Sequence, residues 1–213
     1  MRRGRFITFE GGEGGGKSTQ LKLLAERLEG LRLEVVTTRE PGGSPGAEAV
    51  RDLLVQGAAD RWSPLTETLL MYAARRDHLE RVITPALERG AWVLCDRFAD
   101  STRAYQGAAG GAPAELIATL ERHVVADQWP DLTLVLDLPA ETGLERAAAR
   151  AGLETRFESK GAAFHARLRQ AFLDIARAEP DRCVVVDAAR PLEAVSQAVW
   201  DGVVARLEPP GHG

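Results

Sequence analysis

A glycine-rich loop near the start of the chain carries the residue types that bind phosphate. The stretch GGEGGGKS, residues 11–18, fits the pattern Gly-x-x-x-x-Gly-Lys-Ser/Thr. Glycines let backbone N–H groups turn inward around an anion, and the helix that follows adds its positive end. Lys17 can bridge terminal phosphates, and the Ser18 hydroxyl can ligate Mg²⁺. The loop therefore predicts a nucleoside triphosphate site at Gly11, Gly12, Glu13, Gly14, Gly15, Gly16, Lys17, Ser18 and Thr19.

A second polar group, Asp96 and Arg97, ends an apolar run that starts at Trp92. The carboxyl ends of parallel strands are where α/β sheets bind ligands. A carboxylate there can hold Mg²⁺ or its waters, and a guanidinium can bind a phosphate with two hydrogen bonds. A plain surface ion pair is the alternative for these two residues taken alone. Arg51 is a weaker candidate, because most arginines are simply solvated.

The elements that would position these groups alternate between strand and helix patterns. Helical stripes of apolar residues, such as the one from Leu79 to Leu87, separate short runs rich in Val, Leu and Ile. This alternation predicts an α/β fold, a five-stranded parallel sheet with helices on both faces. The strands are expected at Arg5–Glu10, Leu33–Thr38, Trp92–Asp96, Leu132–Leu138 and Arg182–Asp187.

The chain length suits one domain, which we place at residues 1–207, with a flexible tail at 208–213. A polar, arginine-rich stretch at 141–161 is either a short helical lid or an ordinary pair of solvated helices, and spacing alone does not decide between them.

Composition argues against several partners. The net charge of -4 is unfavourable for binding a nucleic-acid backbone. No apolar run reaches the roughly 18 residues of a membrane span. The start, MRRGRFITFE, is basic but lacks the apolar core of a signal peptide, so we expect a cytoplasmic protein.

Missing motifs narrow the class of nucleotide-binding protein. The chain contains no asparagine, so the guanine-reading motif Asn-Lys-x-Asp cannot occur, and no aspartate has a glycine three positions later. Both absences argue against a GTP switch. A small kinase also needs an acceptor site, arginines that stabilise transition-state charge, and a means of excluding water.

Taken together, the motifs resemble those of bacterial thymidylate kinases, within the P-loop nucleoside monophosphate kinase family. The resemblance spans nearly the whole chain, and the segments TREPGG and AYQG beside DR are its most specific part. It is carried, in family order, by FEGGEGGGKST, TREPGG (38–43), YAAR (72–75), DR (96–97), DSTRAYQG (100–107), PDLTLVLDL (130–138) and DAARPLEAV (187–195).

The resemblance implies phosphoryl transfer from ATP, with Mg²⁺, to dTMP, in a homodimeric enzyme. It implies catalytic roles for Lys17, Asp96, Arg97 and the lid residue Arg156, with Ser18 and Asp96 at the metal. Glu13 is expected near the sugar 3′-hydroxyl. Nearby Arg146 is a weaker candidate to assist Arg156. The acceptor site is expected to comprise Glu13, Glu40, Arg51, Met71, Arg75, Arg97, Thr102, Tyr105 and Gln106.

One position departs from the family pattern. Met71 stands where the family usually has a phenylalanine that stacks on thymine, although Met71 and Arg75 remain one helical turn apart. A thioether packs on rings but loses offset aromatic stacking, worth roughly 0.5–1.5 kcal/mol. Tyr72 could replace that ring if the helix were rotated by one residue.

Two rival functions follow from the same residues. Another nucleoside monophosphate or deoxynucleoside kinase is the first, but a deoxynucleoside would leave Arg51 and Arg97 without a phosphate to bind. A regulatory ATPase is the second, and its ATP turnover would ignore added nucleoside monophosphates.

Overall fold

The protein is built on one parallel sheet. A computed structural model describes residues 3–58, 60–149 and 160–210. The sheet has the order β2-β3-β1-β4-β5, and all neighbouring strands are parallel. Its strands are β1 (Phe6–Glu10), β2 (Val35–Arg39), β3 (Trp92–Asp96), β4 (Leu132–Asp137) and β5 (Cys183–Asp187).

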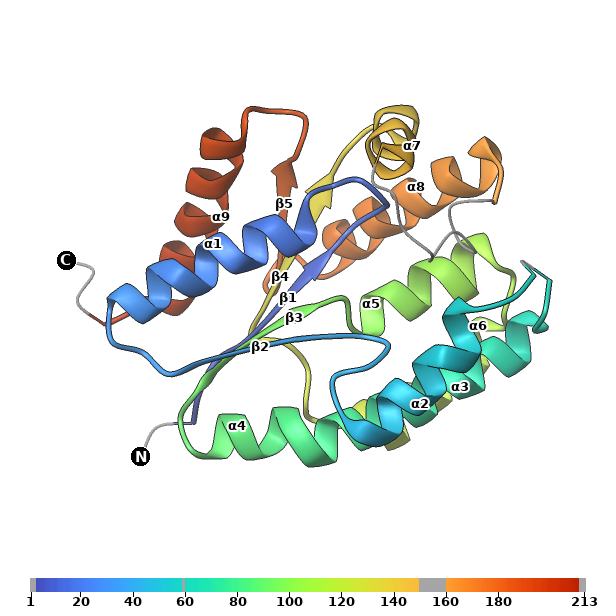
Figure 1. The fold of residues 1–213 in the computed structure, drawn as a ribbon, viewed down its shortest axis with the longest axis horizontal. Coiled ribbons are helices and arrows are strands. Elements are labelled where there is room, and N and C mark those ends of the chain that lie inside the picture. The colour runs from blue at the N-terminus through green and yellow to red at the C-terminus, as the bar shows by residue number, and fades with distance from the viewer. Residues whose placement is uncertain (1–2, 59, 150–159, 211–213) are drawn as a thin grey trace.

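Helices cover both faces of this sheet (Figure 1). One face packs against α1 and α9 in a core that includes Phe9, Leu24 and Val199. The other face packs against α3, η1, α4 and η3 near β3, and against η2 and α8 near β4. The helices are α1 (Lys17–Gly30), α2 (Pro45–Val55), α3 (Pro64–His78), η1 (Leu79–Ile83), α4 (Thr84–Glu88), α5 (Ala99–Thr102), η2 (Arg103–Ala109), α6 (Ala114–Leu120), η3 (Glu121–Val125), α7 (Ala140–Ala148), α8 (Ala162–Ala178) and α9 (Leu192–Leu207).

The α/β fold predicted from the sequence is confirmed, and the strand limits differ by one or two residues. The largest difference is at β2, which begins at Val35 instead of Leu33. The backbone N–H of Leu33 donates to the Leu28 carbonyl, and Arg32 has a φ of 62°, so these residues form the turn that ends α1. A helix-ending turn of this kind is not visible in the pattern of apolar residues.

The carboxyl ends of the strands meet at one edge of the sheet, where the site lies. Phe9 pairs with Asp96 across β1 and β3, and the Glu40 N–H donates to the Asp96 carbonyl. The loop after β1, the turn after β2 and the segment after β3 therefore converge. Among the described residues, none of the helices is long and apolar enough to cross a membrane.

Helix α7 packs directly on the loop that follows β1. A Cβ added to Gly143 would lie 2.4 Å from the Glu13 carbonyl oxygen, and one added to Gly14 would lie 2.1 Å from the Gly143 carbonyl oxygen. Glycine at both positions permits this approach. Of the stretch 141–161 expected as a lid, α7 supplies the first part, and positions 150–159 lie outside the described residues.

Candidate active site

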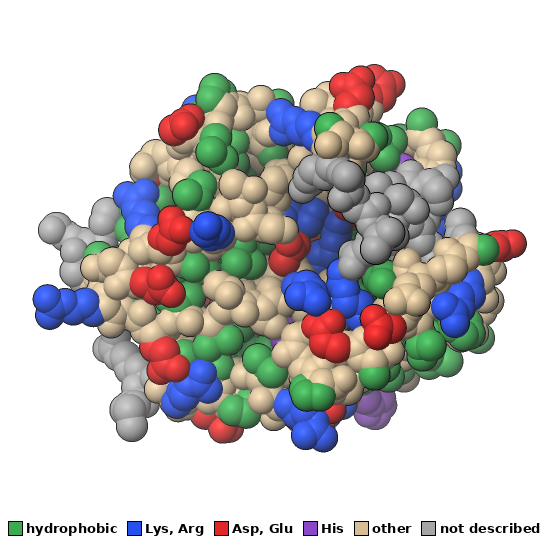
Figure 2. All heavy atoms as spheres, viewed as in Figure 1, with side chains coloured by type: hydrophobic (Ala, Val, Ile, Leu, Met, Phe, Trp, Pro, Cys, Tyr) green, Lys and Arg blue, Asp and Glu red, His purple; other side chains and the backbone are tan. Residues whose placement is uncertain are grey.

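A cavity of about 300 Å³ opens at the carboxyl edge of the sheet, a size typical of small-molecule sites. Figure 2 shows basic side chains gathered in a hollow near the middle of this face. Most of the predicted site residues line the cavity: Glu13, Gly14, Gly15, Gly16, Lys17, Ser18, Glu40, Arg51, Met71, Arg75, Asp96, Arg97, Thr102, Tyr105 and Gln106.

The charge of this cavity is opposite to that of the whole chain. Among the described residues, three acidic side chains line it, namely Glu13, Glu40 and Asp96. Five basic side chains of the same described part oppose them, namely Lys17, Arg39, Arg51, Arg75 and Arg97. A protein of net charge -4 thus concentrates positive charge where two phosphorylated substrates would meet.

The glycine-rich loop turns directly into α1. Gly16 has a φ of 81° and precedes Lys17, the first residue of the helix. The Lys17 Nζ donates to the carbonyl oxygens of Gly12 at 2.7 Å and Gly11 at 3.2 Å. Burial, followed by the nearby Arg97 charge, lowers the pKa of Lys17 to about 8. A phosphate anion beside Nζ would favour the charged form of the lysine.

Ser18 and Asp96 form the pair expected to hold Mg²⁺. The Ser18 hydroxyl donates to Asp96 Oδ2 at 2.6 Å, so both oxygens face the same point beside the loop. Hydroxyl and carboxylate oxygens suit Mg²⁺, which commonly takes one or two protein ligands and completes its shell with water and substrate phosphates. Within residues 3–58, 60–149 and 160–210, no group of three or more His, Cys, Asp or Glu side chains is placed to hold a metal ion.

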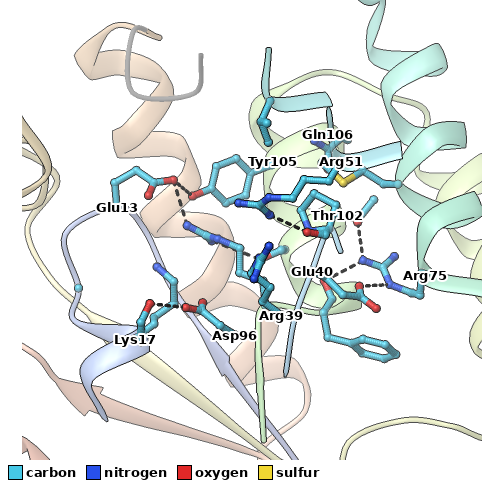
Figure 3. Close-up of a pocket in the computed structure, with 18 of the residues that line it drawn as sticks. Glu13, Lys17, Arg39, Glu40, Arg51, Arg75, Asp96, Thr102, Tyr105 and Gln106 are labelled. Carbon is cyan, nitrogen blue, oxygen red and sulfur yellow. Dashed lines mark hydrogen bonds and ion pairs between the residues drawn. The ribbon is translucent and has the colours of Figure 1, made fainter. Parts of the chain in front are cut away.

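Glu13 lies within the loop without opposing phosphate binding there. Its Oε1 accepts hydrogen bonds from Arg97 Nη2 at 3.0 Å and from the Tyr105 hydroxyl at 2.6 Å (Figure 3). Burial alone would raise the pKa of Glu13, but Arg97 and then Lys17 outweigh it and lower the pKa to about 2. Glu13 is therefore ionised at neutral pH and oriented by two neighbours.

Arg97 is held in an uncommon backbone conformation. Its φ is 71°, in the left-handed region that costs a non-glycine residue roughly 1–3 kcal/mol. Its Nη1 donates to the Gly11 carbonyl at 3.0 Å, and its guanidinium lies 4.8 Å from the centre of the Tyr105 ring. These contacts fix the guanidinium between the phosphate loop and η2.

Arg75 is buried on the opposite side of the cavity (Figure 3). Its Nε donates to Glu40 Oε2 at 2.8 Å, and its Nη2 donates to the Phe98 carbonyl and the Thr102 hydroxyl, both at 3.0 Å. Its Nη1 is buried and has no hydrogen-bond partner among the described residues. Glu40, expected as a substrate contact, thus orients Arg75, and its Oε1 also accepts a hydrogen bond from His78 Nδ1 at 3.0 Å.

The structure distinguishes the two candidate residues for contact with the base. Met71 lines the cavity. Tyr72, the alternative, packs in the core, and its hydroxyl donates to Glu121 at 3.3 Å. Gln106 lies in the π-helical turn η2, and its Nε2 donates to Glu67 Oε1 at 2.8 Å.

Some residues that line this cavity and a second hollow were missed by the sequence analysis. Arg39 lines the cavity at the end of β2, where the rule that placed Asp96 would also have found it. A second hollow adjoins the glycine-rich loop, and Thr19 and Arg146 line it. The Nη1 of Arg146 donates to the Ala188 carbonyl at 3.2 Å. The remaining walls of the hollow come from Gly15, Gly16, Gln20, Ala189, Arg190, Pro191, Leu192 and Val195.

Arg156, the predicted lid arginine, is outside the described residues. Arg51 lines the cavity, and its Nη1 donates to the Pro41 carbonyl at 2.6 Å.

Comparison with known proteins identifies the family of the chain. A family model described as thymidylate kinase matches residues 9–199. The chain is 69% identical to a thymidylate kinase of Caulobacter vibrioides over 207 residues, covering 97% of this chain and 99% of that protein. It is 56% identical to one of a Bradyrhizobium species over 207 residues, covering 96% and 92%. The structure is similar to that of thymidylate kinase from Ehrlichia chaffeensis, with a TM-score of 0.77, 36% identity, and 93% and 98% of the two chains covered. The resemblance expected from the motifs is confirmed, and the chain belongs to the thymidylate kinase family.

Proposed function

We propose that the described cavity performs the family reaction, phosphorylation of dTMP to dTDP, with ATP as the donor. The observation that carries this assignment is the continuity of one cavity from Lys17 and Asp96 to the buried Arg75. Its first end offers phosphate-binding groups, and its second offers Arg75 Nη1, a donor that has no hydrogen-bond partner in the described part of the chain. The ATP phosphates would satisfy the first end, and an acceptor whose phosphate lies beside them and whose base carries a carbonyl would satisfy the second.

The donor phosphates are assigned to the loop and to Lys17. The lysine can exchange the Gly11 and Gly12 carbonyls for phosphate oxygens, which are stronger acceptors. Ser18 and Asp96 would hold Mg²⁺, which neutralises developing phosphate charge when it is bound. The second hollow, beside Thr19 and Arg146, is assigned to the ATP base because it adjoins the same loop.

The acceptor phosphate is assigned to Arg97 and Arg51, which line the cavity between the loop and Arg75. Glu13 is assigned to the sugar, where its ionised carboxylate can accept a hydrogen bond from the 3′-hydroxyl. The proposed base contacts are Arg75, Met71, Thr102 and Gln106. Fixing the acceptor oxygen in line with the donor phosphorus supplies much of the catalysis in phosphoryl transfer.

Arg156 is assigned to the lid and to charge stabilisation on the transferred phosphoryl group. The support is its place in the chain, after α7, which packs on the phosphate loop through Gly143. An arginine that arrives only on closure would couple acceptor binding to transfer and limit wasteful hydrolysis of ATP.

The decisive assay measures ADP release with ATP and Mg²⁺ while dTMP, dUMP, AMP, CMP, GMP or thymidine is added singly. We expect the highest turnover with dTMP. Turnover that is highest with thymidine would assign the enzyme to the deoxynucleoside kinases instead. Turnover that ignores every acceptor would indicate a regulatory ATPase.

We also infer that the protein forms a homodimer and that it is located in the cytoplasm. Leu53 on α2 and Leu65 and Leu69 on α3 are apolar and exposed, and a dimer could bury such side chains. Light scattering on the purified protein would test this state, and a monomer at micromolar concentration would exclude it. ATP and dTMP as substrates support the cytoplasmic location.

A further inference from the structure

Glu67 lies behind the proposed base site without lining the cavity. It is spaced by four residues from Met71 and by eight from Arg75, so all three occupy one face of α3. Met71 and Arg75 reach the cavity, whereas Glu67 is buried and contacts Gln106. The sequence analysis missed this residue, although an acidic side chain on the same helical face was visible there.

The contact between Glu67 and Gln106 constrains an amide that could otherwise face either way. Gln106 Nε2 donates to Glu67 Oε1 at 2.8 Å, and both side chains are buried. An ionised carboxylate only accepts hydrogen bonds. If the amide were flipped, two acceptor oxygens would face each other inside the protein, which is unfavourable. The carboxylate therefore keeps Nε2 toward α3 and leaves Oε1 as the group that Gln106 can offer to a base.

Arg75 supplies a hydrogen-bond donor beside the acceptor oxygen of Gln106 at the proposed base site. Its Nη1 is buried without a described partner, and its other nitrogens are fixed by Glu40, Phe98 and Thr102. Thymine and uracil present a carbonyl acceptor at position 4 and an N–H donor at position 3. Cytosine presents the reverse, an amino donor and an unprotonated ring nitrogen.

We propose that Glu67 is a positioning residue for base selection: it fixes the Gln106 amide so that the site accepts from an N3–H donor and rejects cytosine. The inference rests on the proposed function, because it assumes that Gln106 faces the base of the acceptor nucleotide. Glu67 would act on the base through Gln106. The rejection of cytosine would then depend on the hydrogen bond from Gln106 on η2 to Glu67 on α3, which we call the relay.

The test compares dUMP with dCMP, since both lack the 5-methyl group and differ only at the edge in question. kcat/KM is measured for both acceptors with wild type, Glu67→Gln, Gln106→Ala and the double variant. A glutamine at position 67 can donate or accept a hydrogen bond, so it no longer fixes the orientation of the Gln106 amide. We expect the preference for dUMP to fall roughly tenfold in Glu67→Gln, with an unchanged KM for ATP. In the Gln106→Ala background, the same substitution should leave the preference unchanged.

Glu121→Gln is the matched control, because it neutralises another buried carboxylate, one that contacts Tyr72 and Arg103 instead of Gln106. Its preference for dUMP should equal that of wild type. If Glu67→Gln is poorly folded, the exchange Glu67→Gln with Gln106→Glu replaces it. That variant keeps an acceptor-only group at position 106 and should still prefer dUMP.

An unchanged preference for dUMP over dCMP in Glu67→Gln would overturn the relay. So would a loss of this preference in the Gln106→Ala background as large as the loss that Glu67→Gln causes alone. A preference for dCMP in the exchanged pair would overturn it as well. Failure of the proposed function has a different signature, since wild type would then show no turnover with dTMP.

Discussion

Neutralising Glu40 tests how the buried Arg75 is held. Glu40 is 6% exposed and Arg75 is 2% exposed, and Nε of the arginine lies 2.8 Å from Glu40 Oε2. The second carboxylate oxygen lies 3.0 Å from His78 Nδ1. The substitution Glu40→Gln retains the shape of the side chain but leaves the buried guanidinium without its counter-charge.

Removing one partner of a buried ion pair costs about 3–5 kcal/mol. Because glutamine keeps one acceptor oxygen, we expect the lower end, about 3 kcal/mol. For a chain of this length, such a loss lowers the unfolding temperature by roughly 6–12 °C. The same change should raise the KM for dTMP, because Arg75 loses the contact that fixes its Nε.

Thermal unfolding followed by circular dichroism at pH 7 gives the measurement, and Glu80→Gln gives the matched control. Glu80 pairs with Arg76 at 2.6 Å, but both side chains are more than half exposed, so that pair is worth less than about 1 kcal/mol. An unfolding temperature for Glu40→Gln within about 2 °C of that for Glu80→Gln would refute the argument. It would mean that the charge of Arg75 does not depend on Glu40 for its compensation.

Further predictions concern the loop, the lid and the base pocket. Gly143→Ala should lower kcat at least tenfold, since its Cβ would meet the Glu13 carbonyl at 2.4 Å, whereas Gly30→Ala, with open space around it, should not. Arg156→Ala should lower kcat much more than it raises the KM for dTMP, and a pure loss of binding would place Arg156 in the acceptor pocket. Met71→Phe should lower the KM for dTMP roughly two- to tenfold by restoring aromatic stacking, and an unchanged KM would contradict contact with the base. Burial and then Asp100 raise the pKa of Glu10 from 4.5 to about 8, so the folded state binds this proton more tightly than the unfolded state. As the pH rises from 4.5 to about 8, the free energy of unfolding of wild type should therefore fall relative to that of Glu10→Gln. Parallel pH profiles of the two proteins in chemical denaturation would contradict this.

The sequence predicted the parts of this molecule that depend on local pattern. The strands were visible because runs such as LTLVLDL are apolar throughout, and the phosphate loop was visible because its chemistry lies in adjacent residues. The rule that strand ends hold ligands placed Asp96 and Arg97 correctly at the cavity. These features need no knowledge of distant contacts.

The remaining features arise from contacts between distant segments. Glu40 and Arg75 are 35 positions apart, and only the structure shows that their side chains form a buried ion pair. Gln106 and Glu67 are 39 positions apart, and only the structure shows that they form a buried hydrogen bond. The orientation of α3 about its axis determines whether Met71 or Tyr72 faces the cavity. Packing of α3 in the core directs Tyr72 toward Glu121 and leaves Met71 at the cavity. Periodicity gives the face of a helix but does not say which neighbour covers it.

The two ends of the cavity differ in how their polar groups are satisfied. At the phosphate end, Lys17 donates to loop carbonyls, Ser18 to Asp96, and Arg51 to the Pro41 carbonyl. Substrate phosphates must compete with these partners, so binding there proceeds by exchange of hydrogen bonds.

At the base end, Arg75 and Gln106 are fixed by Glu40 and Glu67, and Arg75 Nη1 already lacks a described partner. A base that matches this end gains its hydrogen bonds without breaking existing ones, which lowers the cost of binding. A base with the wrong edge would oppose a donor and an acceptor that buried carboxylates hold in place. Under the proposed assignments, we therefore expect discrimination between bases to be strongest at the base end, where the protein is already organised. We expect the exchange of hydrogen bonds at the phosphate end to contribute affinity for any nucleotide.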